Sequence, residues 1–362
     1  MAKFRGKEYT KAELLRYAGN MSKIAGIRTS RIDTGKADSI RIHDVRNGDI
    51  QFTVMESRCM DIADFCYKGT ALNFLSKCGP VNTGLAEKEA MNFLRGVTGG
   101  MLYTCGVSNV GTPYQRPSGE LDGEEHFHGR FRFEPAQNVC TDTDWDGDEY
   151  KLTLKGEMRE TGLFHSNVAL RRTIETSLGE NGITLTDRFE NESYVTNPFM
   201  LMYHVNCGFP VIQKDSRIYI PSVSHECTNP QALKETDNWS FATAPVDGGI
   251  ECVYVHQIRH NADGYSCAMA YNEKDGIGIG ITFTADTLPM LLEWRCMAAG
   301  DYVVGLQPTN CMACGRQMEI DRKTLKHIEP FQKIRTQIHI QVIDGEEQFE
   351  AFKKKIDDCT LE

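Results

Sequence analysis

Residues 168–174 read Val168-Ala-Leu-Arg-Arg-Thr-Ile174, and residues 183–187 read Ile183-Thr-Leu-Thr-Asp187. Apolar and polar side chains alternate in these runs with a period of two, which is typical of strands that bury one face. The same period appears in Lys151-Leu-Thr-Leu-Lys155 and in Thr336-Gln-Ile-His-Ile-Gln-Val342. Asp146-Gly147 and Asn181-Gly182 lie where hairpin turns would join such runs. This part of the chain therefore predicts an antiparallel sheet.

Short alternating runs broken by Gly, Asn, Asp and Pro fill most of the remaining chain. Strands and helices do not alternate, which argues against a doubly wound α/β fold. We expect a mainly β protein in which about 20 short strands form two packed sheets, as one domain over residues 1–362. Helix is expected mainly near the ends, with short excursions elsewhere: at about 10–25, after a capping box from Thr10 to Glu13, and at about 346–357.

The composition restricts the possible partners. The 362 residues carry a net charge of −10 and no long run of Lys or Arg, so nucleic acid is not an expected partner. No apolar stretch reaches the ~20 residues that would cross a membrane, and no membrane partner is expected. The 13 cysteines lack a disulfide spacing and the N-terminus lacks an apolar leader, which together predict a cytoplasmic protein with reduced thiols.

Two clusters place arginine in apolar or Gly-rich surroundings. Arg58 and Asp61 follow a predicted strand, where they form either a buried structural ion pair or a site for ligand hydroxyls. Arg95 is the one charge in the Gly-rich stretch 93–106. It is interpreted either as a solvated surface residue or as a ligand-binding one.

Two further clusters contain histidines. On a strand, His126 and His128 would point to the same face. They are either paired metal ligands, as in a cupin-like barrel, or one substrate-binding and one packed histidine. No third ligand is recognisable, so we expect no metal. His204 and Asn206 share a face at the polar end of an apolar strand, where His204 is either a satisfied core residue or a catalytic acid or base.

Five segments resemble, in this order, the aldose 1-epimerase-like branch of the galactose mutarotase superfamily. The resemblance extends from about residue 25 to about residue 345. The segments are Arg58-Cys-Met-Asp-Ile62, Gly99-Gly-Met-Leu-Tyr-Thr-Cys-Gly-Val-Ser-Asn-Val-Gly111, His128-Gly-Arg130, Tyr203-His-Val-Asn-Cys-Gly-Phe-Pro210 and Gly305-Leu-Gln-Pro-Thr-Asn-Cys311.

The resemblance implies a β-supersandwich fold and cofactor-free acid–base chemistry on a small carbohydrate. It implies that His204 is the general acid that protonates the sugar ring oxygen, that His128 orients the sugar, and that Arg95 binds a hydroxyl. The remaining candidate substrate-binding residues are Asn206, Arg58, Asp61, His126 and Trp294.

One position departs from the family pattern. The family's general base is a glutamate in a Leu-Glu-Pro-like motif, whereas this sequence reads Leu306-Gln307-Pro308. An amide has no useful basicity, and loss of a general base typically costs ~10²–10⁴-fold in rate. Glu293 and Glu319 are the nearest carboxylates in sequence, and no pattern places either one in the site.

Three hypotheses follow. The first is an isomerase similar to aldose 1-epimerase that interconverts sugar anomers by acid–base ring opening, with His204 and Gln307 at the catalytic positions. The second is a non-catalytic carbohydrate-binding or sensing protein on the same fold, which the amide of Gln307 suggests. The third is a metal-dependent, cupin-like sugar isomerase or lyase that uses His126 and His128.

Overall fold

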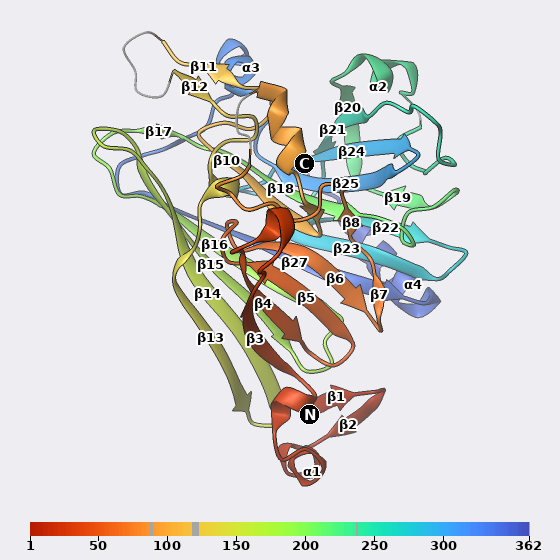
Figure 1. The fold of residues 1–362 in the computed structure, drawn as a ribbon. Coiled ribbons are helices and arrows are strands. Elements are labelled where there is room, and N and C mark those ends of the chain that lie inside the picture. The colour runs from red at the N-terminus through yellow and green to blue at the C-terminus, as the bar shows by residue number, and fades with distance from the viewer. Residues whose placement is uncertain (87–89, 118–122, 237, 362) are drawn as a thin grey trace.

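The computed structural model describes residues 1–86, 90–117, 123–236 and 238–361, and two large antiparallel sheets dominate them (Figure 1). Strands account for 48% of the structure and helices for 13%, which confirms the predicted mainly β fold. Within the described ranges no helix is long and apolar enough to cross a membrane.

The first sheet carries the candidate site described below. Its strands lie in the order β20, β21, β24, β25, β18, β10, β6, β5, β4, β3, and β7 pairs with β6. They span Ser222–Cys227 (β20), Cys252–Ile258 (β21), Met290–Ala298 (β24), Asp301–Thr309 (β25), Met200–Cys207 (β18), Leu102–Val107 (β10), Asp61–Tyr67 (β6), Thr70–Ala71 (β7), Ile50–Met55 (β5), Arg41–Arg46 (β4) and Gly26–Arg31 (β3).

The second sheet contains the alternating runs that predicted the fold. Its order is β13, β14, β15, β16, β27, β23, β22, β19. The strands span Gln137–Asp146 (β13), Glu149–Thr161 (β14), Asn167–Ser177 (β15), Gly182–Asn191 (β16), Lys333–Asp344 (β27), Ile277–Thr284 (β23), Tyr265–Asn272 (β22) and Arg217–Tyr219 (β19).

Short elements join and flank the two sheets. Among the described residues the two-stranded pairs are β1 (Ala2–Phe4) with β2 (Lys7–Tyr9), β8 (Phe74–Leu75) with β9 (Gly99–Gly100), β11 (Tyr114–Gln115) with β12 (Glu124–Glu125), and β17 (Asn197–Pro198) with β26 (His327–Ile328). The helices are α1 (Lys11–Tyr17), α2 (Pro230–Lys234), α3 (Arg316–Arg322) and α4 (Glu346–Asp357), and the 3₁₀ turns are η1 (Met21–Lys23), η2 (Gly35–Ala37), η3 (Ala90–Gly96) and η4 (Phe131–Phe133).

The N-terminal helix is shorter than the sequence predicts. Thr10 and Glu13 form the expected capping box, but α1 ends at Tyr17. The side chain of Asn20 then accepts a hydrogen bond from the backbone of Ser22 and caps a separate 3₁₀ turn, η1.

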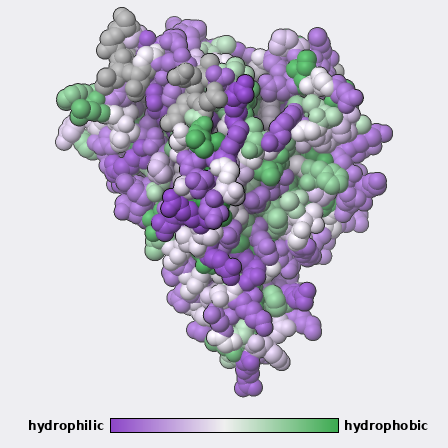
Figure 2. Space-filling model, viewed as in Figure 1, coloured by the Kyte–Doolittle hydropathy of each residue, from purple (hydrophilic) through white to green (hydrophobic). Residues whose placement is uncertain are grey.

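Figure 1 shows α1 with β1 and β2 at the narrow end of the molecule. In Figure 2 the same face is broad at the opposite end, and hydrophilic side chains cover most of it.

The main core lies between the two sheets. Along β18, alternate side chains point into this core and toward the opposite face, where the candidate site lies. Leu201, Tyr203 and Val205 belong to the main core cluster, whereas Met200 and Met202 belong to a second apolar cluster on the other face of the strand. Because successive side chains point to opposite faces, His204 also lies on that outer face.

An ion-pair network is buried directly beneath the strand that carries His204. The guanidinium of Arg172 donates to both carboxylate oxygens of Asp187, at 2.9 and 2.7 Å, and to Asp61 at 3.2 Å. The hydroxyl of Tyr203 donates to Asp187 at 2.6 Å. Burial raises the pKa of Asp61 to about 6, even though Arg172 and hydrogen bonds from Thr104 act in the opposite direction. Through Tyr203, the network therefore holds the core-facing side of β18 in place.

Replacing Arg172 with methionine should destabilise the protein by about 3–5 kcal/mol, because two buried carboxylates lose their counter-charge. The matched control is Arg171→Met on the same strand, whose partly exposed partners are Glu157, Glu190 and Glu192. Exposed ion pairs contribute about 0–1 kcal/mol. Denaturant unfolding of both variants measures the difference, and equal losses would contradict the structural role given to Arg172.

Candidate functional site

A cavity of about 300 Å³ lies on the outer face of the first sheet. One row of side chains crosses four strands at its base. Leu292 on β24 is opposite Gln307 on β25, and Tyr103 on β10 is opposite His204 on β18. The pairs Met202–Thr309 and Val205–Leu306 set the register of β18 against β25, which places Gln307 beside His204. Pairing of distant strands thus brings Tyr103, His204 and Gln307 together.

The protonation of His204 follows from the orientation of the Asn206 amide. Asn206 Nδ2 donates to the backbone oxygens of Gly100 at 3.1 Å and His204 at 3.3 Å. Its Oδ1 therefore faces His204 Nδ1, at 2.5 Å. Because an amide oxygen only accepts, Nδ1 carries the proton and Nε2 of the neutral ring is an acceptor.

Gln307 supplies the hydrogen bond to that acceptor. Its Nε2 lies 3.0 Å from His204 Nε2, as a donor. Burial lowers the pKa of His204 to about 3, against a smaller opposite effect of the hydrogen bond to Asn206. The site is thus built around a neutral imidazole. Gln307 therefore contacts this ring directly.

Gly305 keeps the space that this arrangement needs. A side chain at Gly305 would place its Cβ 2.5 Å from Gln307 Nε2 and 3.4 Å from Asn206 Oδ1. Because Gly305 has no side chain, the side chains of Gln307 and Asn206 have room to contact His204.

His128 enters the cavity from a turn. Its φ is 60°, and the backbone N–H of Gly111 donates to its Nδ1 at 3.1 Å. In the neutral ring Nε2 then carries the proton and is a donor. Burial lowers the pKa of His128 well below its usual value, and His204 and Arg132 act in the same direction. The ring centroids of His128 and His204 are 6.1 Å apart.

Aromatic rings form much of the remaining wall. Tyr103 stacks on His204 with centroids 4.5 Å apart, and Trp294 meets His204 edge-on at 5.2 Å. Phe127 packs edge-on against His128 at 4.4 Å and stacks on Phe93 at 4.3 Å. An apolar wall with a few convergent polar groups is typical of a small-molecule site.

Five of the predicted site residues therefore line one cavity: His128, His204, Asn206, Trp294 and Gln307. Their roles toward a ligand stay predictions. Arg58 and Asp61 lie in the interior instead. Arg58 is buried and donates to the backbone oxygens of Val81 at 2.7 Å and Arg132 at 3.2 Å. Asp61 accepts from Thr104 and Arg172. Neither residue lines the cavity.

Arg95 and His126 also lie outside the cavity lining. Arg95 is exposed on η3, a segment that contributes Phe93 and Leu94 to the wall. His126 packs edge-on against Phe133, and its Nε2 is 3.4 Å from the guanidinium of Arg130. Residues 126–129 form a turn closed by the Gly129 N–H and the His126 oxygen, so the strand alternation expected for His126 and His128 is wrong.

Sequence reasoning missed Tyr103 and Glu251, which both line the cavity. Tyr103 is in the site because it is paired with His204, and Glu251 because it precedes a strand that pairs with β24. Glu293 and Glu319, the carboxylates considered from the sequence, lie elsewhere. Glu293 is buried 3.6 Å from His256, and Glu319 accepts from the backbone of Met312 at 2.7 Å.

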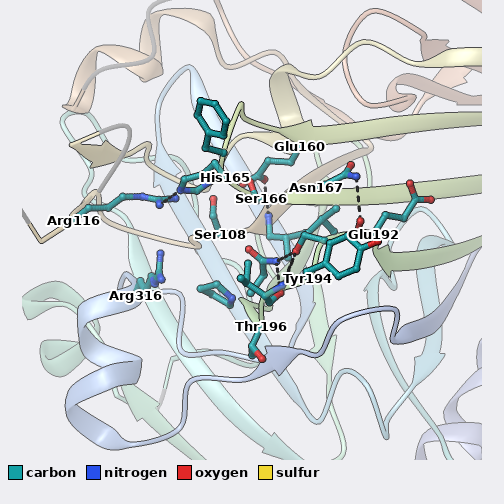
Figure 3. A pocket seen from close by; sticks show the side chains of 17 residues that line it. Ser108, Arg116, Glu160, His165, Ser166, Asn167, Glu192, Tyr194, Thr196 and Arg316 are labelled. Atoms are coloured by element: carbon teal, nitrogen blue, oxygen red, sulfur yellow. Dashed lines mark hydrogen bonds between the residues drawn. The ribbon is translucent and has the colours of Figure 1, made fainter. Parts of the chain in front are cut away.

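A larger cavity of about 970 Å³ lies at the ends of β10, β14 and β15 (Figure 3). Figure 3 shows Arg116, His165 and Arg316 on one side of it and Asn167, Glu192 and Tyr194 on the other. Burial, and then the nearby charge of Glu125, raise the pKa of Glu160 there to about 8. Among the described lining residues none is a predicted site residue, so we assign the candidate site to the smaller cavity.

The two sheets have the fold of galactose mutarotase-like proteins of known structure. A provisionally assigned aldose 1-epimerase from Klebsiella pneumoniae superposes with a TM-score of 0.85 at 19% identity, over 93% of this chain and 92% of the other. A galactose mutarotase-like protein from Clostridium acetobutylicum gives 0.60 at 13% identity, over 89% and 99%. A galactose 1-epimerase from Lactobacillus acidophilus gives 0.56 at 10% identity, over 89% and 100%.

The chain belongs to the family described as Domain of unknown function (DUF4432), whose model matches residues 37–342. Among curated proteins no sequence matches this one. The similarity to the solved structures establishes the fold, and the chemistry of the site has to be argued from its own residues.

Proposed function

We propose that the protein binds a free sugar in the smaller cavity and interconverts its anomers by acid–base ring opening, without a metal or other cofactor. One observation carries the proposal: two histidines, an asparagine and a glutamine converge in a cavity walled by aromatic rings. Aromatic faces suit the C–H surfaces of a sugar ring, and the polar groups suit its hydroxyls.

The reaction moves two protons. A base takes the proton of the O1 hydroxyl, the C1–O5 bond breaks as the C1 carbonyl forms, and an acid protonates O5. Rotation about C1–C2 and the reverse steps then give the other anomer. We assign protonation of O5 to His204 in its imidazolium form and hydrogen bonding of a hydroxyl to the Nε2–H of His128.

A second candidate function is sugar binding without turnover. The neutral His204 favours it, because a ring with a pKa of about 3 is protonated in only about one molecule in 10⁴ at pH 7. The cupin-like alternative has less support, since the Nε2 of His126 faces the cationic Arg130.

Polarimetry on a panel of pure aldose anomers, together with calorimetric binding, tests the proposal. We expect weak but measurable acceleration for at least one free aldose and weaker binding of phosphorylated aldoses. The physical reason is that the one charged side chain among the described lining residues, Glu251, repels an anion. Binding without acceleration would favour the second function, and loss of activity on metal chelation would contradict the cofactor-free mechanism.

A further inference from the structure

Among the residues that the structure places around the smaller cavity, Glu251 is the one carboxylate. It directly precedes β21, in which Val253 is opposite Trp294 of β24. Because side chains alternate along a strand, Glu251 and Val253 project on the same side as Trp294. Glu251 therefore belongs to the wall that also contains Trp294.

Two side chains hold Glu251 in place. The indole Nε1 of Trp294 donates to its Oε2 at 2.6 Å, and Asn229 Nδ2 donates to its backbone oxygen at 2.8 Å. Asn229 is itself fixed, because its Oδ1 accepts from the backbone of Ala232 as the N-cap of α2. No hydrogen bond to Glu251 Oε1 is found within the described part of the chain, and the residue is exposed. One carboxylate oxygen is oriented while the other is accessible.

The same indole links Glu251 to His204. The Trp294 ring lies edge-on to His204, with centroids 5.2 Å apart, while its Nε1 points to the carboxylate. His204 and Glu251 thus contact the same indole ring and line the same cavity of about 300 Å³. Two groups held by one ring in one cavity can act on different oxygens of one sugar. Glu293 is excluded from this role because it neighbours Trp294 on β24 and so points to the opposite face.

We propose that Glu251 is the general base of this site, in place of Gln307. The inference rests on the proposed function. Glu251 takes the proton of O1, the electrons of the O1–H bond form the C1 carbonyl, and those of the C1–O5 bond go to O5, which is protonated by His204. In reclosure O5 attacks C1 while its proton returns to His204, and the carbonyl oxygen takes the proton back from Glu251 as O1–H forms again. Trp294 is a positioning residue that orients the carboxylate through its N–H.

Glu251→Gln should lower kcat by ~10²–10⁴-fold with little change in KM, because the amide keeps the shape but cannot accept the proton. Glu235→Gln is the matched control. Its side chain accepts from Gln231 in α2, outside the cavity, and its kcat should equal that of the wild type. In Glu251→Ala, added formate should restore turnover in proportion to its concentration, which a purely structural role would not predict.

The outcomes separate the two proposals. If the wild type accelerates no aldose of the panel, the proposed function is wrong and the role of Glu251 is overturned with it. If the wild type is active but Glu251→Gln retains its full kcat, or formate fails to rescue Glu251→Ala, then Glu251 is not the base while the proposed function stands. Trp294→Phe should lower kcat less than Glu251→Gln does, and an equal or larger loss would contradict the positioning role of the indole.

Discussion

Replacing His204 with alanine should abolish the anomerisation that the wild type catalyses, with a loss of ~10²–10⁴-fold. The ring oxygen would lose its proton donor, and Asn206 and Gln307 would each lose a hydrogen-bond partner. Polarimetry measures the loss, and unfolding curves show whether the variant is folded. His327→Ala is the control, because His327 is exposed on β26, outside the cavity. An active, folded His204→Ala protein would exclude His204 as the acid.

The pH dependence of the anomerisation rate is a second test of His204 as the acid. His204 acts as an acid only when protonated, and its pKa is lowered to about 3 mainly by burial. Above that pKa the imidazolium fraction rises about tenfold for each unit by which the pH falls. The enzymatic rate, corrected for the spontaneous reaction, should therefore rise as the pH is lowered from 8 to 6. His204→Ala should lack this rise, and a flat profile for the wild type would contradict the assignment.

The sequence predicted the fold because the second sheet has one buried face. In β15 and β16 apolar and polar side chains alternate, and this local signal needs no knowledge of the partner strand. The order of the strands within a sheet could not be predicted in this way. The neighbours of β18 are β10 and β25, about 100 residues away on either side, and no pattern within a strand encodes such pairing.

In the candidate site, too, the features that depend on local alternation were predicted, and those that depend on turns or on distant strand pairing were not. His204 and Asn206 lie two apart on a strand, so their shared face followed from the sequence. His126 and His128 have the same spacing, but His128 adopts a positive φ in a turn, where alternation does not apply. For Arg58 the sequence left a buried structural role and a ligand-binding role open, and its side chain is bonded to backbone oxygens in the interior. Glu251 carries no local signal, because the pairing of β21 with β24 is what brings it to Trp294.

Replacing Gln307 with glutamate should raise the rate of anomerisation. A carboxylate would then lie beside His204 Nε2, where Gln307 Nε2 now lies at 3.0 Å. Its negative charge would favour the imidazolium and raise the pKa of His204, since an opposite charge within ~4–6 Å stabilises the charged form. It would also supply a second base near the bound sugar. The gain is at most ~10²–10⁴-fold, the usual effect of a positioned general base.

The measurement is polarimetry of Gln307→Glu beside Gln307→Met, which fills a similar volume without a polar group. The glutamate variant should show its pH-dependent rise at higher pH than the wild type, and the methionine variant should bind sugar more weakly without gaining rate. In the double variant with Glu251→Gln, the new carboxylate should restore part of the lost activity, because either carboxylate can accept the O1 proton. If the wild type already turns over a common aldose at typical enzyme rates and Gln307→Glu slows it, the amide is the functional partner of His204. Gln307 would then hydrogen-bond to both protonation states of the ring. Its Nε2 donates to the neutral form, and its oxygen, after rotation of the amide, accepts from the imidazolium.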